Sequence, residues 1–357
     1  MLSSPMQVQR LRRQLVQRSA AVLAVLLLAS SLTSPAFAER MPAFIGATAW
    51  FNSKPLTAQD LRGKVVLVDF WTYSCINCLR TLPTMRAWNE RYKDAGLVIV
   101  GVHTPEFTFE ADPTKVERAI RRFGITYPVA LDGQRAIWDA FHNRYWPAHY
   151  LVDAQGRIRF THFGEGGDDE EEHEIQKLLA ERNAHTVAPR ANVRRSGTAI
   201  EQTADFASVG SPETYIGFAR AENFVSPGGL AHDRACVYTT PKRLALNEWA
   251  FTGNWTSHLQ SALLGSATGS ILFHFHARDL HLVLGPGASA KPLRFRVLLD
   301  GQAPGADHGA DTDEQGYGTV TEDRLYQLVR QRGKVRDRSF EIQFLDAGVQ
   351  AFSFTFG

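Results

Sequence analysis

Cys75 and Cys78 are separated by two residues, a spacing that suits reversible disulfide chemistry. A thiolate rather than a thiol attacks a disulfide, so such a site needs one reactive cysteine and a second that resolves the mixed disulfide. At the start of a helix, unpaired backbone N–H groups and the helix dipole stabilise a thiolate. We therefore expect Cys75 to be an exposed nucleophile of lowered pKa and Cys78, one turn deeper, to be the resolving thiol.

Zinc binding is the main alternative for a C-x-x-C pair. The chain has neither a second C-x-x-C nor an H-x-x-x-H partner. The sequence therefore predicts no metal at this pair, and it indicates no cofactor. The third cysteine, Cys236, is expected to be a small buried side chain.

The segments around the cysteine pair predict an α/β fold. Residues 65–71 form a β-branched, apolar run typical of a central buried strand. Apolar residues then recur at helical spacing up to Gly96, which predicts a helix that covers one face of the sheet. Further strands and helices alternate, which implies parallel pairing. They are expected at residues 97–102 (strand), 112–123 (helix), 127–131 (strand), 134–141 (helix), and 150–152 with 158–160 (a hairpin around Gln155 and Gly156).

An acidic run at residues 168–172 precedes Ile175, Leu178 and Leu179. Acidic residues in the first turn of a helix complement the helix dipole. We therefore expect a helix that closes the first domain, with the acidic residues forming a solvated face rather than a metal site.

Three segments carry a family resemblance: residues 70–83 (FWTYSCINCLRTLP), 103–107 (HTPEF) and 145–148 (YWPA). They resemble the thioredoxin superfamily and, more narrowly, TlpA-type reductases and the extracytoplasmic thioredoxin-like region of DipZ proteins. The resemblance implies a thioredoxin-like α/β domain, with cytochrome c biogenesis as one setting in which such reductases act.

The resemblance also implies roles for residues beside the pair. Asp69 would be the base that accepts the proton of Cys78, which suits a carboxylate whose charge is disfavoured inside a sheet. Pro147 matches the cis-proline that faces the redox pair and presents backbone for strand-like pairing with the substrate. A trans loop proline is the alternative at that position.

Aromatic residues near the pair are expected to form an apolar rim that contacts the target protein. The candidates are Trp71, Tyr73 and Trp146. Core packing explains one or two of them equally well.

The chain departs from thioredoxin at Ile76 and Asn77, which replace a Gly-Pro pair, so the redox potential of thioredoxin does not carry over to this chain.

Thr72 lies three residues before Cys75 and resembles the T-x-x-C of peroxiredoxins, but Val68 stands where that motif has proline. A thiol peroxidase is therefore the alternative enzyme. The nearby Cys78 favours disulfide exchange.

From residue 215 the pattern changes to short alternating strands, such as 271–276, 293–299 and 340–344, with Gly and Pro clusters between them. This pattern predicts an antiparallel jelly-roll sandwich. Residues 249–255, 325–330 and 354–357 resemble the C-terminal domain of DipZ proteins, a carbohydrate-binding-module-like sandwich. The resemblance implies a glycan- or protein-binding surface, with Trp249, Trp255 and Tyr317 as candidates for stacking on a sugar.

Two weaker patterns in this second half could bind metal. His274 and His276 point to one side of a strand, although an exposed or hydrogen-bonded pair is favoured. The spacing of five residues resembles that of an EF-hand calcium loop: Asp311, Asp313, Gln315, Gly316 and Glu322. We do not favour calcium binding, because Gln315 replaces Asp or Asn and no amphipathic helix clearly enters the loop.

The first 38 residues are predicted to be a signal peptide. Four arginines precede a short apolar run at residues 20–29, and Ala36 and Ala38 form an A-x-A cleavage site. Arg12-Arg13 loosely resembles a twin-arginine signal, so the Sec and twin-arginine routes both stay open. Removing these four arginines changes the net charge from +2 to +2 − 4 = −2, which gives no electrostatic case for nucleic acid binding.

The sequence thus predicts a signal peptide (1–38), a thioredoxin-like domain (39–185), a linker (186–212) and a β-sandwich (213–357). We expect a periplasmic or otherwise extracytoplasmic thiol-disulfide oxidoreductase, soluble after cleavage. It would reduce protein disulfides and be re-reduced by a separate membrane electron donor of the CcdA/DsbD kind. The alternative from a different class is a cell-envelope protein that binds glycans or proteins and whose thiols only stabilise the fold.

Overall fold

The computed structural model describes residues 39–183, 199–288 and 291–357. The predicted signal peptide and the first part of the predicted linker lie outside the described residues. Within these ranges, no helix combines the length and hydropathy that crossing a bilayer requires.

The α/β region contains a six-stranded mixed sheet with the order β1-β4-β3-β2-β5-β6. β2 and β3 are parallel, as are β3 and β4, whereas β1, β5 and β6 pair in antiparallel fashion. The fully buried β2 lies near the centre of the sheet, as predicted. The strands are β1 (Ala49–Phe51), β2 (Val65–Trp71), β3 (Leu97–His103), β4 (Val129–Leu131), β5 (Ala148–Val152) and β6 (Ile158–Phe163).

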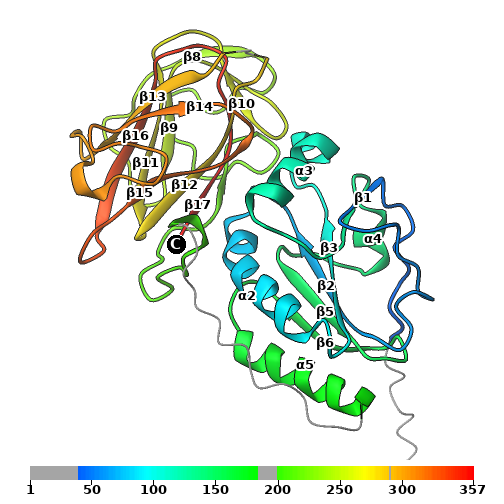
Figure 1. The fold of residues 1–357 in the computed structure, drawn as a ribbon. Coiled ribbons are helices and arrows are strands. Elements are labelled where there is room, and N and C mark those ends of the chain that lie inside the picture. Colours follow the sequence, from blue (N-terminus) through cyan, green and yellow to red (C-terminus); the bar gives the residue numbers. More distant parts are fainter. Residues whose placement is uncertain (1–38, 184–198, 289–290) are drawn as a thin grey trace, which may run out of the picture. The chain divides into compact units, whose positions relative to one another are not determined.

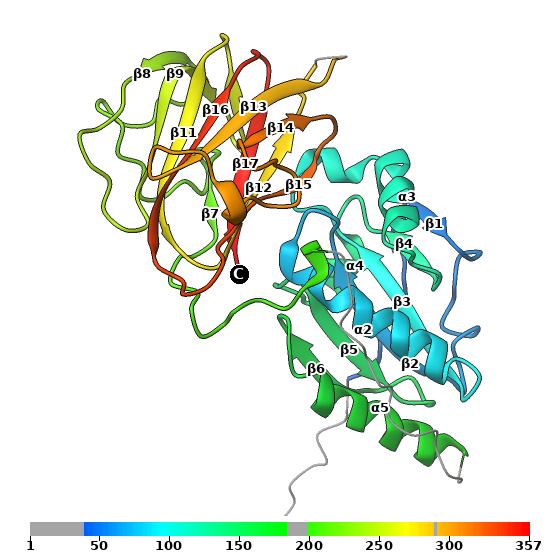
Figure 2. The same ribbon diagram turned by 60° about the vertical axis from the view of Figure 1, so that its left-hand side comes forward.

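Helices cover both faces of this sheet. Because side chains alternate along a strand, Leu67 of β2 faces α2, α3 and α5, whereas Val68 faces α4 and the segment before β2. Figures 1 and 2 show α2 and α5 along the same side of the sheet. Asp69 shares the side of Leu67, the side on which α2 carries the cysteines. The helices are α2 (Ile76–Tyr92), η2 (Thr108–Ala111), α3 (Pro113–Arg122), α4 (Ala136–Ala140), α5 (Asp168–Asn183) and η3 (Ala199–Glu201).

The strands and helices predicted for this region are all present, with end shifts of a few residues. Asp112 caps α3 by accepting the N–H of Thr114 at 2.8 Å. The predicted hairpin joins β5 to β6, and Gly156 in its turn has φ 80°, a conformation that favours glycine. The short edge strand β1 was not predicted.

The start of α5 corrects the prediction of a solvated acidic face. Glu171 and Glu172 are only 1% and 4% exposed. Glu172 accepts a hydrogen bond from the hydroxyl of Tyr92 at 2.6 Å, and Glu171 contacts His149 at 2.9 Å. The acidic run therefore contains both exposed and buried carboxylates, because one side of the first turn of α5 packs onto α2 and β5.

The predicted linker is ordered where the structure describes it. Ile200 in η3 packs against the hydrophobic cluster that includes α2. Glu201 is buried and pairs with Arg86 of α2 at 2.7 Å. Residues 199–201 are thus anchored to the α/β region.

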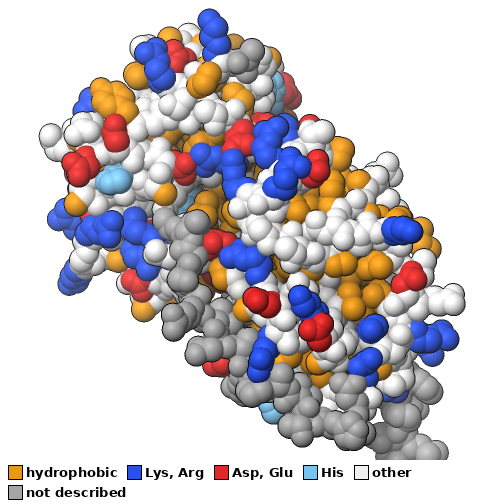
Figure 3. Space-filling model, in the orientation of Figure 1, with side chains coloured by type: hydrophobic (Ala, Val, Ile, Leu, Met, Phe, Trp, Pro, Cys, Tyr) orange, Lys and Arg blue, Asp and Glu red, His pale blue; other side chains and the backbone are white. Residues whose placement is uncertain are grey.

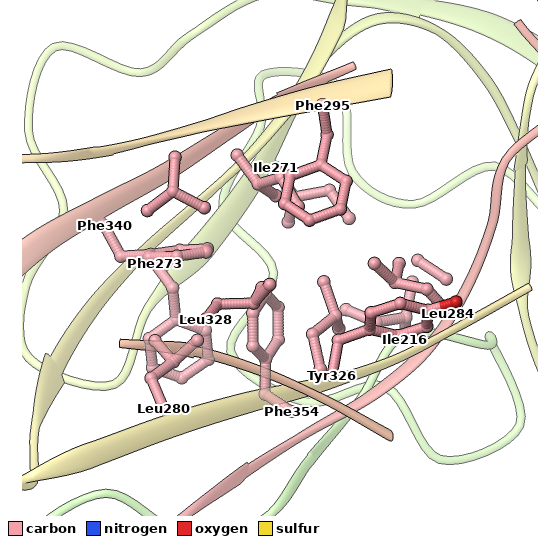
Figure 4. Close-up of a cluster of buried hydrophobic side chains, with 14 of the residues drawn as sticks. Ile216, Ile271, Phe273, Leu280, Leu284, Phe295, Tyr326, Leu328, Phe340 and Phe354 are labelled. Carbon is pink, nitrogen blue, oxygen red and sulfur yellow. The ribbon is translucent and has the colours of Figure 1, made fainter. Parts of the chain in front are cut away.

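The C-terminal region forms an antiparallel 11-stranded sheet around one hydrophobic core, consistent with the predicted β-sandwich. Figure 4 shows Phe273, Phe340 and Phe354 directed toward this core. The strands are β7 (Thr214–Tyr215), β8 (Ala235–Tyr238), β9 (Trp249–Ser257), β10 (Ala262–Leu264), β11 (Gly269–His276), β12 (Asp279–Gly285), β13 (Leu293–Leu299), β14 (Tyr317–Val320), β15 (Arg324–Arg330), β16 (Asp337–Phe344) and β17 (Gln350–Phe356), with η4 (Gly305–Asp307) between β13 and β14.

A β-bulge in β17 turns one aromatic side chain away from the sandwich core. Leu282 pairs with Phe354 and Leu284 pairs with Ala351, so β17 carries an extra residue there. Phe352 consequently packs on Phe109 of the α/β region, with ring centroids 4.8 Å apart.

Residues 40–357 belong to one compact unit, and the predicted domain boundaries stay a prediction.

Candidate active site

The two cysteines lie at the start of α2. Cys75 is the N-cap of this helix, and the N–H of Cys78 donates to its sulfur at 3.2 Å. Cys75 is half-buried, whereas Cys78 is fully buried. Both are free thiols, as is Cys236. The more accessible sulfur thus belongs to the residue predicted to be the nucleophile.

The expected lowering of the Cys75 pKa is wrong for this structure. Burial raises the pKa of the Cys75 thiol, and Glu106 and Glu213 raise it further, whereas hydrogen bonding with Cys78 opposes the rise. Burial also raises the pKa of Cys78 well above its ordinary value, with added contributions from Cys75 and Asp69. Both groups are therefore mainly protonated at neutral pH, and reaction requires that a proton be removed.

A buried carboxylate fixes the loop that leads into Cys75. Glu110 of η2 is fully buried, and its Oε1 accepts hydrogen bonds from the Thr72 hydroxyl at 2.5 Å and the Ser74 hydroxyl at 2.7 Å. Its Oε2 accepts the backbone N–H groups of Glu106 at 2.8 Å and Phe107 at 2.9 Å. In the sequence, the one indication of a role for Glu110 was a charge at the end of an aromatic segment, and Glu110 was not predicted as a site residue. Its carboxylate joins two loops beside the redox pair.

Asp69, His149 and His162 occupy one rung of the sheet. Asp69 is opposite His149, and His149 is opposite His162 on the edge strand β6. Oδ1 of the buried Asp69 lies 3.4 Å from Nε2 of His149, and Oε2 of Glu171 lies 2.9 Å from the other ring nitrogen, Nδ1. Burial alone lowers the pKa of His149, but the interactions with Glu171 and Asp69 raise it to about 10. The predicted base thus lies next to a buried histidine whose interactions with Glu171 and Asp69 favour its protonated form.

The peptide bond between Trp146 and Pro147 is cis, as the resemblance implies. Trp146 is half-buried, and its indole N–H donates to the carbonyl of Thr104 at 3.1 Å. A groove of about 630 Å³ lies beside Cys75 and includes Trp146. Its other lining residues include Asn77, Arg144, Tyr145, Tyr215 and Phe356.

Two family models match the chain, the AhpC/TSA family over residues 37–161 and the thioredoxin-like C-terminal domain over residues 211–357. The thiol-disulfide oxidoreductase YkuV of Bacillus subtilis is 33% identical over 143 residues, which are 40% of this chain and 96% of YkuV. This chain belongs to the thioredoxin-like thiol-disulfide oxidoreductases.

Two further relatives differ in how much of this chain they match. The thiol-disulfide oxidoreductase ResA of Geobacillus kaustophilus is 30% identical over 156 residues, 42% of this chain and 86% of ResA. The DipZ protein of Mycobacterium bovis is 36% identical over 320 residues, 88% of this chain. The chain spans 42% of the length of that DipZ protein.

Of the three predicted rim residues, only Trp146 lines the groove beside Cys75. Trp71 is fully buried, with its ring 5.0 Å from that of His103. Tyr73 is also buried and stacks on the same histidine at 5.5 Å. Both rings belong to the core on the α2 side of the sheet, so the predicted contact of Trp71 and Tyr73 with a target is wrong for this structure.

Two of the three predicted sugar-stacking residues are also in a core. Trp249 and Trp255 are fully buried in the sandwich, and Trp255 stacks on Phe251 with ring centroids 4.7 Å apart. Tyr317 is 47% exposed. The sequence pattern did not separate core tryptophans from surface ones, because both types occur in alternating strands.

The residues of the two weaker metal patterns have other partners. Asp311 binds Arg324 at 2.7 Å and accepts the N–H of Gln327 at 2.8 Å. His276 binds Asp337 at 2.5 Å, and His274 lies 3.2 Å from the carbonyl of Leu244. Among the residues that the structure describes, no group of three His, Cys, Asp or Glu side chains is placed to hold a metal ion.

Proposed function

We propose that this chain reduces disulfide bonds of protein substrates by thiol–disulfide exchange at Cys75 and Cys78. The observation that carries the proposal is the pair at the start of α2, where the half-buried Cys75 sulfur accepts the N–H of the buried Cys78. A nucleophile open to a groove and a resolving thiol one turn deeper are what the reaction requires.

The reaction proceeds in two exchanges. The Cys75 thiol gives its proton to water, and the resulting thiolate attacks one sulfur of the substrate disulfide. This attack forms a mixed disulfide and releases the other sulfur as a thiolate, which takes up a proton from water. Asp69 then takes the proton of Cys78, and the Cys78 thiolate attacks the Cys75 sulfur. The second substrate sulfur leaves and takes up a proton from water, so the substrate gains two electrons and the cysteine pair loses them.

The groove beside Cys75 supports binding of an extended segment of the substrate. Trp146 supplies an apolar wall next to Cys75, and Pro147 follows it through the cis bond. We propose that the backbone at these two residues pairs with the substrate in the manner of an added strand.

Insulin reduction tests this function. The wild-type chain should reduce insulin disulfides in the presence of dithiothreitol, and Cys75→Ser should fall to the rate of dithiothreitol alone. Cys236→Ser is the matched control, because this third thiol lies in β8 of the sandwich. Equal rates for wild type and Cys75→Ser would favour the alternative in which the thiols are structural.

Peroxide reduction is the weaker enzymatic alternative. The Thr72 hydroxyl, which would orient a peroxide in that chemistry, is fully buried and donates to Glu110 at 2.5 Å. We therefore expect peroxide turnover well below disulfide exchange when both are measured on the same sample.

We also propose that the protein acts outside the cytoplasm and is re-reduced by a separate membrane electron donor of the CcdA/DsbD kind. The predicted signal peptide and the likeness to DipZ over 88% of the chain support this placement. Fusion of residues 1–38 to a reporter that is active only after export tests the location. Retention of the reporter in the cytoplasm would contradict it.

For the sandwich we propose an anionic glycan as a second ligand. Lys and Arg side chains gather around the connection between β15 and β16 (Figure 3), where a hollow of about 370 Å³ includes Arg332, Lys334 and Arg336. Binding of the full chain to an acidic polysaccharide should weaken when these three residues are replaced by serine. Unchanged binding of the triple serine variant would contradict glycan binding at this hollow. Tyr317→Ala tests the remaining sugar-stacking candidate in the same assay.

A further inference from the structure

The carboxylate of Asp69 is buried without the hydrogen bonds that usually stabilise such a group. Neither of its oxygens accepts a hydrogen bond from any residue that the structure describes. Burial without hydrogen-bond partners disfavours the charged form of a carboxylate. A nearby positive charge would stabilise the carboxylate form that accepts a proton from Cys78.

His149 is placed to supply that charge. Its Nε2 lies 3.4 Å from Oδ1 of Asp69, in ion-pair range, and its Nδ1 lies 2.9 Å from Oε2 of Glu171. A neutral imidazole carries only one N–H. When both carboxyl groups are ionised, each nitrogen must therefore carry a proton, and the ring is an imidazolium ion.

Three other elements contribute residues around Asp69 and His149. β6 contributes His162, whose ring centroid is 6.3 Å from that of His149. β3 contributes Gly101, opposite Asp69, beyond which lie Trp71 and Tyr127. α2 contributes Cys78, whose pKa Asp69 helps to raise.

We propose that His149 is a positioning residue that keeps Asp69 in its carboxylate form, and that Glu171 keeps His149 protonated. The inference rests on the proposed function, in which Asp69 is the base for Cys78. Before the proton transfer the three side chains carry two negative charges and one positive charge. After Asp69 accepts the proton of Cys78, one negative and one positive charge remain, so the buried cluster becomes neutral as the Cys78 thiolate forms.

The test separates the two exchanges with dithiobis(nitrobenzoate) as the substrate disulfide. In a Cys236→Ser background, attack by Cys75 releases one thionitrobenzoate, and attack by Cys78 on the mixed disulfide releases the second. Stopped-flow absorbance follows both. We expect His149→Gln to slow the second release by about 10- to 100-fold and to leave the first within about twofold. His149→Lys, which restores a cation, should recover most of the loss.

Coupling to Asp69 distinguishes positioning from loss of structure. Asp69→Asn should slow the second release, and adding His149→Gln to it should cause little further slowing, because the two residues act as one unit. Glu171→Gln should slow the second release, whereas Glu170→Gln, at an exposed position of the same helix, should not. Near-ultraviolet circular dichroism identifies variants that fail to fold.

The outcomes separate this inference from the proposed function. A wild-type chain that releases no second thionitrobenzoate would contradict the proposed function itself. If Asp69→Asn slows the second release and a folded His149→Gln does not, the inference alone is overturned. Equal slowing of both releases by His149→Gln, or additive effects with Asp69→Asn, would also overturn it.

Discussion

Nδ1 of His149 and Oε2 of Glu171 are 2.9 Å apart, and both side chains are almost completely buried, at 3% and 1% exposure. This contact joins the first turn of α5 to β5. A buried pair of this kind is costly to break from one side, because the remaining charge keeps no partner. An electrostatic contact between Glu171 and His149 therefore connects α5 to the part of the sheet that holds Asp69.

The stability of the protein should depend on pH through His149. Its folded pKa of about 10 lies above the ordinary value of 6.5. A raised pKa means that the folded state binds the proton more tightly, so this stabilisation is complete below about pH 6.5 and is lost as the pH rises through about 10. Urea unfolding of wild type and His149→Gln at several pH values isolates the contribution. The difference between the two free energies of unfolding should shrink toward pH 10, and a constant difference would contradict the assignment.

Cys78→Ser should trap the mixed disulfide. Cys75 can still attack a substrate, but no second thiol is present to release it. Incubation with oxidised substrate should therefore give an adduct that runs as a larger species on a non-reducing gel and disappears with dithiothreitol. Cys75→Ser is the matched control and should give little adduct. An adduct of equal yield in both variants would show that Cys75 is not the thiol that attacks the substrate.

Removing the charge of Glu106 should make Cys75 more reactive. The Glu106 carboxylate raises the pKa of the Cys75 thiol, so Glu106→Gln should lower it and increase the thiolate fraction. We expect alkylation of Cys75 by iodoacetamide at pH 7 to accelerate by about two- to fivefold. The variant also alters hydrogen bonds from Tyr215 and Arg220, so Tyr215→Phe serves as the control for those contacts. Slower alkylation in a folded Glu106→Gln protein would contradict this prediction.

Glu110→Gln should loosen the loop before Cys75. The amide can accept at only one atom, so the hydrogen bonds of Thr72 and Ser74 or those of Glu106 and Phe107 lose their acceptor. We expect a loss of about 2 kcal/mol in the free energy of unfolding, measured by urea titration, and slower insulin reduction. Glu170→Gln should change stability by less than about 0.5 kcal/mol.

Trp249→Ala should destabilise the sandwich, whereas Tyr317→Ala should not. Trp249 is fully buried and contacts Phe224 and Phe251 at 4.7 and 5.1 Å between ring centroids. Truncating such a side chain leaves a cavity and costs about 3–5 kcal/mol. Tyr317 is 47% exposed, and its replacement should cost less than about 0.5 kcal/mol. Thermal unfolding compares the two, and equal effects would show that Trp249 is not a core residue.

The local sequence was enough to predict the strand and helix that carry the cysteine pair. An apolar run followed directly by Cys75 and Cys78 gave a buried strand that leads into a helix, because strand burial and helix geometry act over a few residues. Pro147 was assigned through the family resemblance, and its cis bond is present. The alternation of strands and helices likewise predicted the α/β region.

Tertiary structure decided which side chains face each other across elements. Trp71 and Trp146 were both predicted to contact a target protein, and Trp249 was predicted to stack on a sugar. Only strand pairing and helix placement put Trp146 at the groove and the other two in cores. His149 and Glu171 are 22 positions apart, so their contact depends on how α5 packs on β5. Burial by distant residues is also what raises the pKa of Cys75, against the local effect of its helix.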